Sequence, residues 1–205
     1  DFQRAGLSAR QRMSLTWVDG VAADTVPADD RGLHYADGAF ETLSCDEGRI
    51  QCEDLHRRRL TRALAALRVT SAAEQGARLI SEAGQRLKAA RHTGIARLTV
   101  TRGSGPRGYM PPEMPQLRSI LHAHPRPESS HAALRCGVAA TRWATQVQLA
   151  GLKLLARTEQ VLAAGEGIAD GWDDMVMLDS DDHVISSSRA NLFMLLGKQV
   201  VTPCL

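Results

Sequence analysis

The chain has 205 residues, of which 43% are hydrophobic and 23% are charged, as in ordinary globular proteins. Its 25 basic and 23 acidic side chains give a formal net charge of +2, so nothing favours broad binding to nucleic acid or to a membrane surface. No apolar run approaches the roughly 20 residues of a membrane span. The cysteines form no CxxC pair and no zinc-like spacing with histidine. We therefore expect a cytoplasmic protein with reduced thiols and no metal.

The first twelve residues, Asp1 to Arg12, are polar and basic and lack the apolar region of a secretory signal. Met13 follows, directly ahead of the strand-like run Leu15–Val18. We interpret residues 1–12 as an upstream or cloning-derived extension and Met13 as the natural start.

Residues 13–124 show both periodicities of regular structure. Apolar side chains at helical spacing predict helices over Glu53–Leu67 and Ala72–Arg91. Period-two alternation and turns such as Asp19-Gly20 predict strands between and around them. The expected strands are Leu15–Val18, Phe40–Leu43, Arg49–Cys52, Ile95–Arg102 and Ser119–His124. This mixture predicts an N-terminal α/β domain over residues 13–124.

The polar segment Pro125–Ser130 contains two prolines and is the expected domain linker, residues 125–130. Residues 131–205 then form an incomplete, strand-rich second domain that contains a helix over Thr158–Ala169. Its expected strands are Leu134–Thr141, Met175–Leu178, His183–Ile185, Leu192–Leu196 and Gln199–Thr202. Strands and helices in two parts indicate the α+β class.

The segment Gly103–Gly108 fits the pattern G-x-G-x-x-G of dinucleotide-binding turns. Such a turn must open a helix, whose N-terminus holds the pyrophosphate. Here Met110-Pro111-Pro112 follows, and proline forces the preceding residue out of helical geometry. We therefore predict a flexible, arginine-bearing loop near a functional site.

Two cationic features admit more than one interpretation. In the run Arg57-Arg58-Arg59, the side chains either form a solvated helix face or include one that turns inward to bind an anion through its planar fork of donors. Lys153 stands alone between apolar residues. It is either a snorkelling lysine, which context by itself favours, or a buried amine whose lowered pKa suits Schiff-base chemistry.

Four segments resemble, in order, the fold-type-IV pyridoxal-phosphate (PLP) enzymes, the class-IV aminotransferase family. The resemblance implies an α+β, two-domain D-amino-acid aminotransferase-like fold whose second domain is truncated. The segments are Asp30–Thr42, the helix motif Leu55–Leu60, the stretch Ala150–Ala163, and the hairpin Asp179–Phe193 that ends in Asn-Leu-Phe.

The resemblance implies a role for particular residues. Lys153 is the catalytic lysine that forms the Schiff base with PLP, and Arg59 contacts the cofactor phosphate. Ser186 stands where the family usually places the glutamate that faces the pyridine nitrogen, and Asn191 follows it in the cofactor site. The loop residues Arg107 and Tyr109 are expected to contact substrate carboxylates, which rests on their position and chemistry.

Within the family, Thr101–Tyr109 and Gly151–Leu162 most resemble the aminodeoxychorismate lyases. The implied reaction converts 4-amino-4-deoxychorismate to 4-aminobenzoate and pyruvate in folate biosynthesis. The alternatives are a D-amino-acid or branched-chain aminotransferase of the same fold, and a catalytically inactive PLP-fold fragment. A small-molecule substrate and a homodimer are further implications of the resemblance.

Two departures from the family qualify these expectations. A serine hydroxyl at position 186 can bond the pyridine nitrogen but supplies no charge, which argues against a transaminase that depends on a stabilised carbanion. The final segment Val201–Leu205 resembles the segment that, in the family, comes just before the second phosphate-binding element, so that element is not among the 205 residues. We therefore expect the 205-residue chain to bind PLP weakly and to be inactive.

Overall fold

The computed structural model describes residues 14–127, 132–144 and 146–203. Contacts divide the chain into two compact units: unit 1 is Asp1–Glu128 together with Leu152–Leu155, and unit 2 is Ser129–Gly151 with Ala156–Leu205. The predicted extension 1–12 and part of the predicted linker 125–130 lie outside the described residues. Among those that are described, no helix has the length and apolarity to cross a bilayer.

Unit 1 is built on a six-stranded antiparallel sheet with the order β2-β1-β6-β5-β3-β4. The strands that the sequence predicts are present, but the predicted Arg49–Cys52 shortens to two residues because helix α2 begins at Glu53. The strands are β1 (Leu15–Val18), β2 (Val21–Ala22), β3 (Gly38–Asp46), β4 (Arg49–Ile50), β5 (Gly94–Thr101) and β6 (Arg118–His124).

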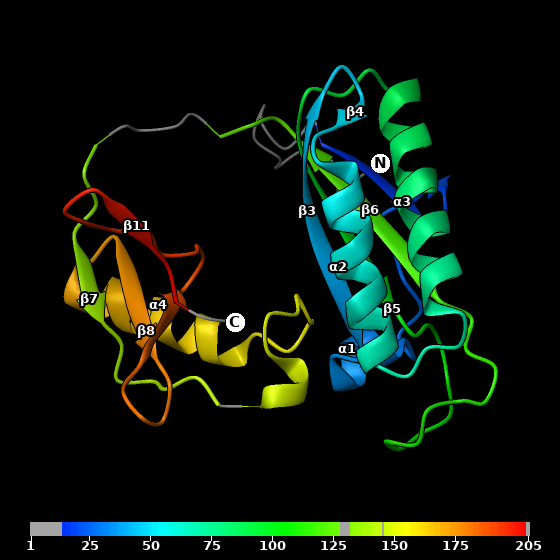
Figure 1. The fold of residues 1–205 in the computed structure, drawn as a ribbon. Helices are drawn as coiled ribbons and strands as arrows, with labels where there is room; N and C mark the ends of the chain where they lie inside the picture. Colours follow the sequence, from blue (N-terminus) through cyan, green and yellow to red (C-terminus); the bar gives the residue numbers. More distant parts are fainter. Residues whose placement is uncertain (1–13, 128–131, 145, 204–205) are drawn as a thin grey trace, which may run out of the picture. The chain divides into compact units, whose positions relative to one another are not determined.

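Helices α2 (Glu53–Ala66) and α3 (Ala72–Ala89) cover one face of this sheet (Figure 1). The leucines on their inward faces, among them Leu60, Leu64 and Leu79, are almost fully buried in the core. A further helix, α1 (Arg31–Tyr35), was not predicted, because five residues are too few for a periodic pattern. Asp30 caps α1: its Oδ1 accepts a hydrogen bond from the Gly32 amide at 2.8 Å.

Gly48 closes the turn between β3 and β4 in a conformation that favours glycine, with φ +80°, and a Cβ there would lie 2.3 Å from Lys88 Cα. Gly84, within α3, has room: its nearest atom would be Ile50 Cδ1 at 3.6 Å. We expect Gly48→Ala to lower the free energy of unfolding by about 2–3 kcal/mol. Gly84→Ala should raise it by about 0.5–1 kcal/mol, because alanine is the better helix former. Urea denaturation of both variants measures this, and effects of the same sign would contradict it.

Unit 2 contains a small mixed sheet, in which β7 (Cys136–Val138) runs parallel and β9 (Val184–Ser187) antiparallel to β8 (Asp174–Leu178). Helix α4 (Thr158–Asp170) packs on β8. A 3-10 turn, η2 (Val147–Leu149), lies between β7 and α4. A separate hairpin follows the sheet, made of β10 (Met194–Leu196) and β11 (Gln199–Val201).

The predicted strand Leu134–Thr141 is longer than the observed β7. On each side of β7, backbone amides bond to side chains instead of to a neighbouring strand. The Arg135 amide donates to the Asp173 carboxylate at 2.8 Å, and the Ala140 amide donates to Glu166 at 2.6 Å. These carboxylates replace the sheet partners, so the ladder ends there.

Candidate functional site

Lys153 lies on a strand-like segment that pairs with the open edge of β3. Strand β4 covers that edge only at Cys45 and Asp46. At the other end, the Phe40 amide donates to the Lys153 carbonyl at 2.8 Å, and the Leu155 amide donates to the Gly38 carbonyl at 3.0 Å. The predicted second domain, 131–205, includes Lys153. The contacts instead assign Leu152–Leu155 to unit 1, because its backbone hydrogen bonds are made to β3.

Alternation along this segment determines which way Lys153 points. Leu152 and Leu154 are buried in the core beneath the helices, so Lys153 projects to the opposite face of the sheet. Its Nζ lies 5.0 Å from the centre of the Phe40 ring. Arg97 of β5 lies over the same ring at 3.7 Å, and partial burial lowers the pKa of Arg97. An amine and a guanidinium therefore share one aromatic surface.

Arg59 is the member of the arginine run that turns toward the sheet. Its Nε donates to Oε1 of the buried Glu41 at 2.7 Å, and its Nη2 donates to Oε2. His56, one helical turn earlier, contacts Oε2 through Nδ1 at 2.7 Å. Arg57, by contrast, pairs with the exposed Asp54. Arg59 therefore follows the interpretation in which one arginine of the run turns inward, whereas Arg57 lies on the solvated face.

Burial alone would raise the pKa of Glu41, but the hydrogen bonds from Arg59 and His56 outweigh it and lower the pKa overall. The same contact raises the pKa of Arg59. The side chain of Arg59 is 34% exposed, and its Nη1 has no hydrogen-bond partner in the part of the chain that the structure describes. An anion can therefore bind this nitrogen while Glu41 holds the other two.

These side chains fit PLP in chemistry. Lys153 offers a primary amine for the cofactor's aldehyde carbon, and Arg59 offers guanidinium donors for its phosphate. Lys153 contacts Phe40 and Arg59 contacts Glu41. These are neighbouring residues of β3 in unit 1, and side chains alternate along a strand, so the two contacts lie on opposite faces of the sheet near its open edge. Glu41, the partner that orients Arg59, was not predicted as a site residue. A lone acid within an apolar strand was the available signal.

The glycine-rich loop does not open a helix: no helix follows Gly103 before β6 begins at Arg118, as Met110-Pro111-Pro112 predicts. Arg107 and Tyr109 are exposed on this loop, Tyr109 to 87%. Both belong to unit 1. The dinucleotide interpretation is thereby excluded for this segment.

Ser186 and Asn191 belong to unit 2. Ser186 lies on β9 and is half-buried, and its hydroxyl donates to the Ser187 carbonyl at 2.8 Å. Asn191 is exposed in the loop after β9. Buried Asp174 of β8, which was not predicted as a site residue, accepts hydrogen bonds from Ser187 Oγ at 2.8 Å and Ser188 Oγ at 2.6 Å. Asp174 therefore fixes the turn that joins the two predicted site residues.

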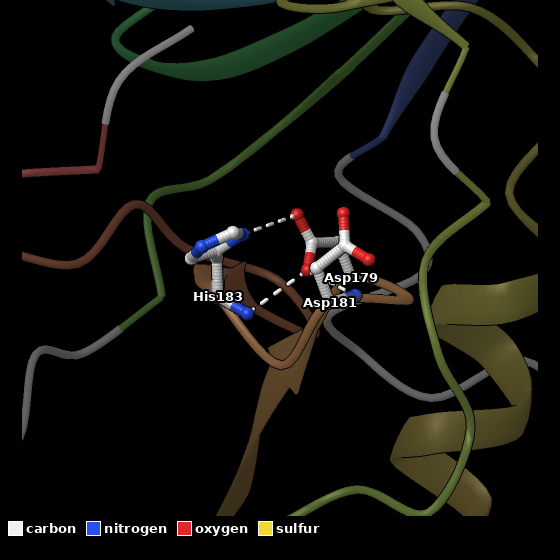
Figure 2. A group of neighbouring side chains, drawn as sticks. All are labelled: Asp179, Asp181 and His183. Carbon is white, nitrogen blue, oxygen red and sulfur yellow. Dashed lines mark hydrogen bonds and ion pairs between the residues drawn. The ribbon is translucent and has the colours of Figure 1, made fainter.

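A second group of titratable side chains lies in the turn between β8 and β9 (Figure 2). Oδ1 of Asp179 accepts the backbone amides of Asp181 and His183, both at 2.9 Å, and its Oδ2 contacts His183 Nδ1 at 3.2 Å. These bonds lower the pKa of Asp179, the His183 amide most of all. Because the contacts close a tight turn, we interpret the group as a turn cap.

Comparison with known proteins places this geometry in context. Residues 38–205 match the family described as amino-transferase class IV. The chain is 30% identical over 193 residues to an aminodeoxychorismate lyase of Vibrio harveyi, covering 92% of this chain and 70% of that one. It is 38% identical to the crystal structure of a 4-amino-4-deoxychorismate lyase from Pseudomonas aeruginosa, with a TM-score of 0.84 and the same two coverages.

A hypothetical aminotransferase from Mycobacterium tuberculosis, solved in a PLP-bound form, shares the fold at 19% identity. Its TM-score is 0.72, and the match covers 93% of this chain and 70% of that one. The α+β fold, with a lysine at the open edge of β3, defines an enzyme of the fold-type-IV class. The chain belongs to the class-IV aminotransferase family. The family and fold expected from the sequence are confirmed.

Proposed function

We propose that this protein is a PLP-dependent carbon–oxygen lyase that converts 4-amino-4-deoxychorismate to 4-aminobenzoate and pyruvate, a step of folate biosynthesis. The observation that carries the proposal is the lysine at the β3 edge in a chain 38% identical to a lyase of that specificity. Bound PLP would supply the electron sink for the elimination.

The residues of the chain divide the remaining work. Nζ of Lys153 would hold the cofactor and, as a free amine, would accept the proton from the amine-bearing carbon of the substrate. Nη1 of Arg59 binds the phosphate. In unit 2, Ser186 and Asn191 are proposed cofactor contacts, and the Ser186 hydroxyl is the proposed partner of the pyridine nitrogen.

Arg107 and Tyr109 are the proposed contacts for the carboxylates of the substrate. Arg107 has no ion pair with another residue in the described ranges, so its guanidinium remains available to a ligand. The homodimer and the cytoplasmic location that we expect from the sequence stay predictions.

Position 186 favours the lyase over an aminotransferase. A serine hydroxyl cannot hold a positive charge on the pyridine nitrogen as a carboxylate does, so the electron sink is weaker. In the lyase reaction the product gains an aromatic ring, which itself drives the elimination. An aminotransferase lacks that driving force and depends more on the missing charge.

The test is a direct comparison of reactions in the complete protein supplied with PLP. We expect pyruvate release from 4-amino-4-deoxychorismate to exceed the rate of transamination of D-alanine or of branched-chain amino acids. Faster transamination of D-alanine would contradict the lyase assignment. Binding of PLP without either reaction would instead support the inactive-fold alternative.

A further inference from the structure

We propose that Arg31 is a positioning residue that holds the loop Gly105–Tyr109 in shape for the substrate. The proposal rests on the function proposed above, because it takes Arg107 and Tyr109 of this loop as substrate contacts. Arg31 lies at the start of α1, far from the loop in sequence, and is 2% exposed.

Most of the hydrogen bonds that the Arg31 guanidinium donates go to backbone carbonyls of this loop. Nη1 donates to the Gly108 carbonyl at 2.9 Å and reaches the Pro106 carbonyl at 3.4 Å, while Nη2 donates to the Tyr109 carbonyl at 3.1 Å. These three carbonyls surround Arg107. The main chain on both sides of the proposed substrate contact is thus held by one side chain.

Charge balance for the buried guanidinium comes from outside the loop. Nε of Arg31 donates to Oδ2 of Asp37 at 2.9 Å. The same oxygen accepts Nε of Arg102 at 2.7 Å, and Arg102 also donates to the Leu67 carbonyl at 2.6 Å. Arg102 therefore shares the carboxylate partner of Arg31 but, among the described residues, makes no hydrogen bond to the loop, which makes it a matched control.

Tyr35, at the end of α1, adds a second attachment. Its hydroxyl accepts the Gly108 amide at 2.9 Å, and its ring lies edge-on to that of Tyr109 at 5.5 Å between centres. Arg31 in turn lies over the Tyr35 ring at 4.8 Å. Gly108 has φ +106°, a value that few other residues adopt. One short helix therefore fixes both the amide and the carbonyl of Gly108.

The loop is exposed and is followed by Pro111-Pro112, so without the bonds from Arg31 and Tyr35 we would expect it to open. Arginine suits the clamp because its planar fork presents several donors at once, whereas lysine offers a single point charge. Arg31→Lys should keep the ion pair with Asp37 but lose the bonds to the loop carbonyls. Arg102→Lys should weaken the separate ion pair between residue 102 and Asp37 and leave the bonds to the loop carbonyls intact.

Limited trypsin digestion measures the opening, because Arg107 is itself a cleavage site in the loop. We expect Arg31→Lys to accelerate cleavage after Arg107 about tenfold relative to cleavage after Arg189 in unit 2, and Arg102→Lys to change it less than about twofold. The milder variant Tyr35→Phe, which removes only the hydroxyl, should accelerate it about threefold. Equal acceleration in Arg31→Lys and Arg102→Lys, or none in either, would overturn the proposal.

The second readout is kinetic and uses the complete protein with PLP. We expect Arg31→Lys to raise KM for 4-amino-4-deoxychorismate about tenfold with a smaller change in kcat, since Lys153 and Arg59 lie outside the loop. The cofactor's absorbance should be unchanged. Faster cleavage with an unaltered KM would overturn the substrate role of the loop. A protein without lyase activity would contradict the proposed function but leave the digestion result intact.

Discussion

In the complete protein, replacing Lys153 with alanine is expected to abolish the absorbance band of bound cofactor and to reduce turnover by at least about a thousandfold. The variant lacks the only group at the edge of β3 that we propose both to hold the cofactor and to move the proton. Absorbance titration with PLP and a pyruvate assay measure the two effects. Alanine at the exposed Lys88 of α3 is the control, and it should alter neither.

A companion variant, Lys153→Arg, separates chemistry from folding. Arginine keeps a cation beside the Phe40 ring but is not a nucleophile at neutral pH. We expect a free energy of unfolding close to that of the parent protein, with the cofactor band absent. A normal band or normal turnover in either variant would show that Lys153 is not the cofactor anchor.

Glu41→Gln is expected to lower the free energy of unfolding by about 2 kcal/mol, because it leaves the charge of Arg59 without its partner while Arg59 remains partly exposed to water. Affinity for PLP should fall as well, since Glu41 orients the guanidinium that we propose binds the phosphate. Glu82→Gln is the matched control. Glu82 pairs with Arg78 on the surface of α3, where both side chains are nearly half exposed, and its loss should cost less than about 0.5 kcal/mol. Urea denaturation compares the two, and equal losses would contradict the prediction.

The pH dependence of stability follows from the same residue. Because the pKa of Glu41 is lower in the folded chain than its ordinary value of 4.5, the unfolded chain binds the proton first as pH falls. The stabilisation is therefore fully present above pH 4.5 and is lost as pH falls through the lower, folded-state pKa. Glu41→Gln should flatten this acid limb in denaturation experiments between neutral pH and pH 3, roughly the range over which carboxylates titrate. A variant with an unchanged acid limb would exclude Glu41 as its source.

The chain's local patterns determined most of its elements. Period-two alternation predicted β5 and β6, and leucines at helical spacing predicted α2, because each pattern reflects which side of one element faces the core. Runs of chemistry-bearing residues, such as Asp30–Thr42 and Ala150–Ala163, were enough to indicate the family. Elements too short to repeat a pattern, such as α1, escaped the same reasoning.

Only the tertiary structure decided which side chains act together. Consecutive residues on a helix point about 100° apart, so at most one of the three arginines could meet β3, and the position of Glu41 selects Arg59. Likewise, the apolar flanks of Lys153 were compatible with a snorkelling side chain. Its placement beside Phe40 depends on backbone hydrogen bonds between segments more than 100 residues apart. Such long-range pairing leaves no local signature, because either partner alone reads as an ordinary strand.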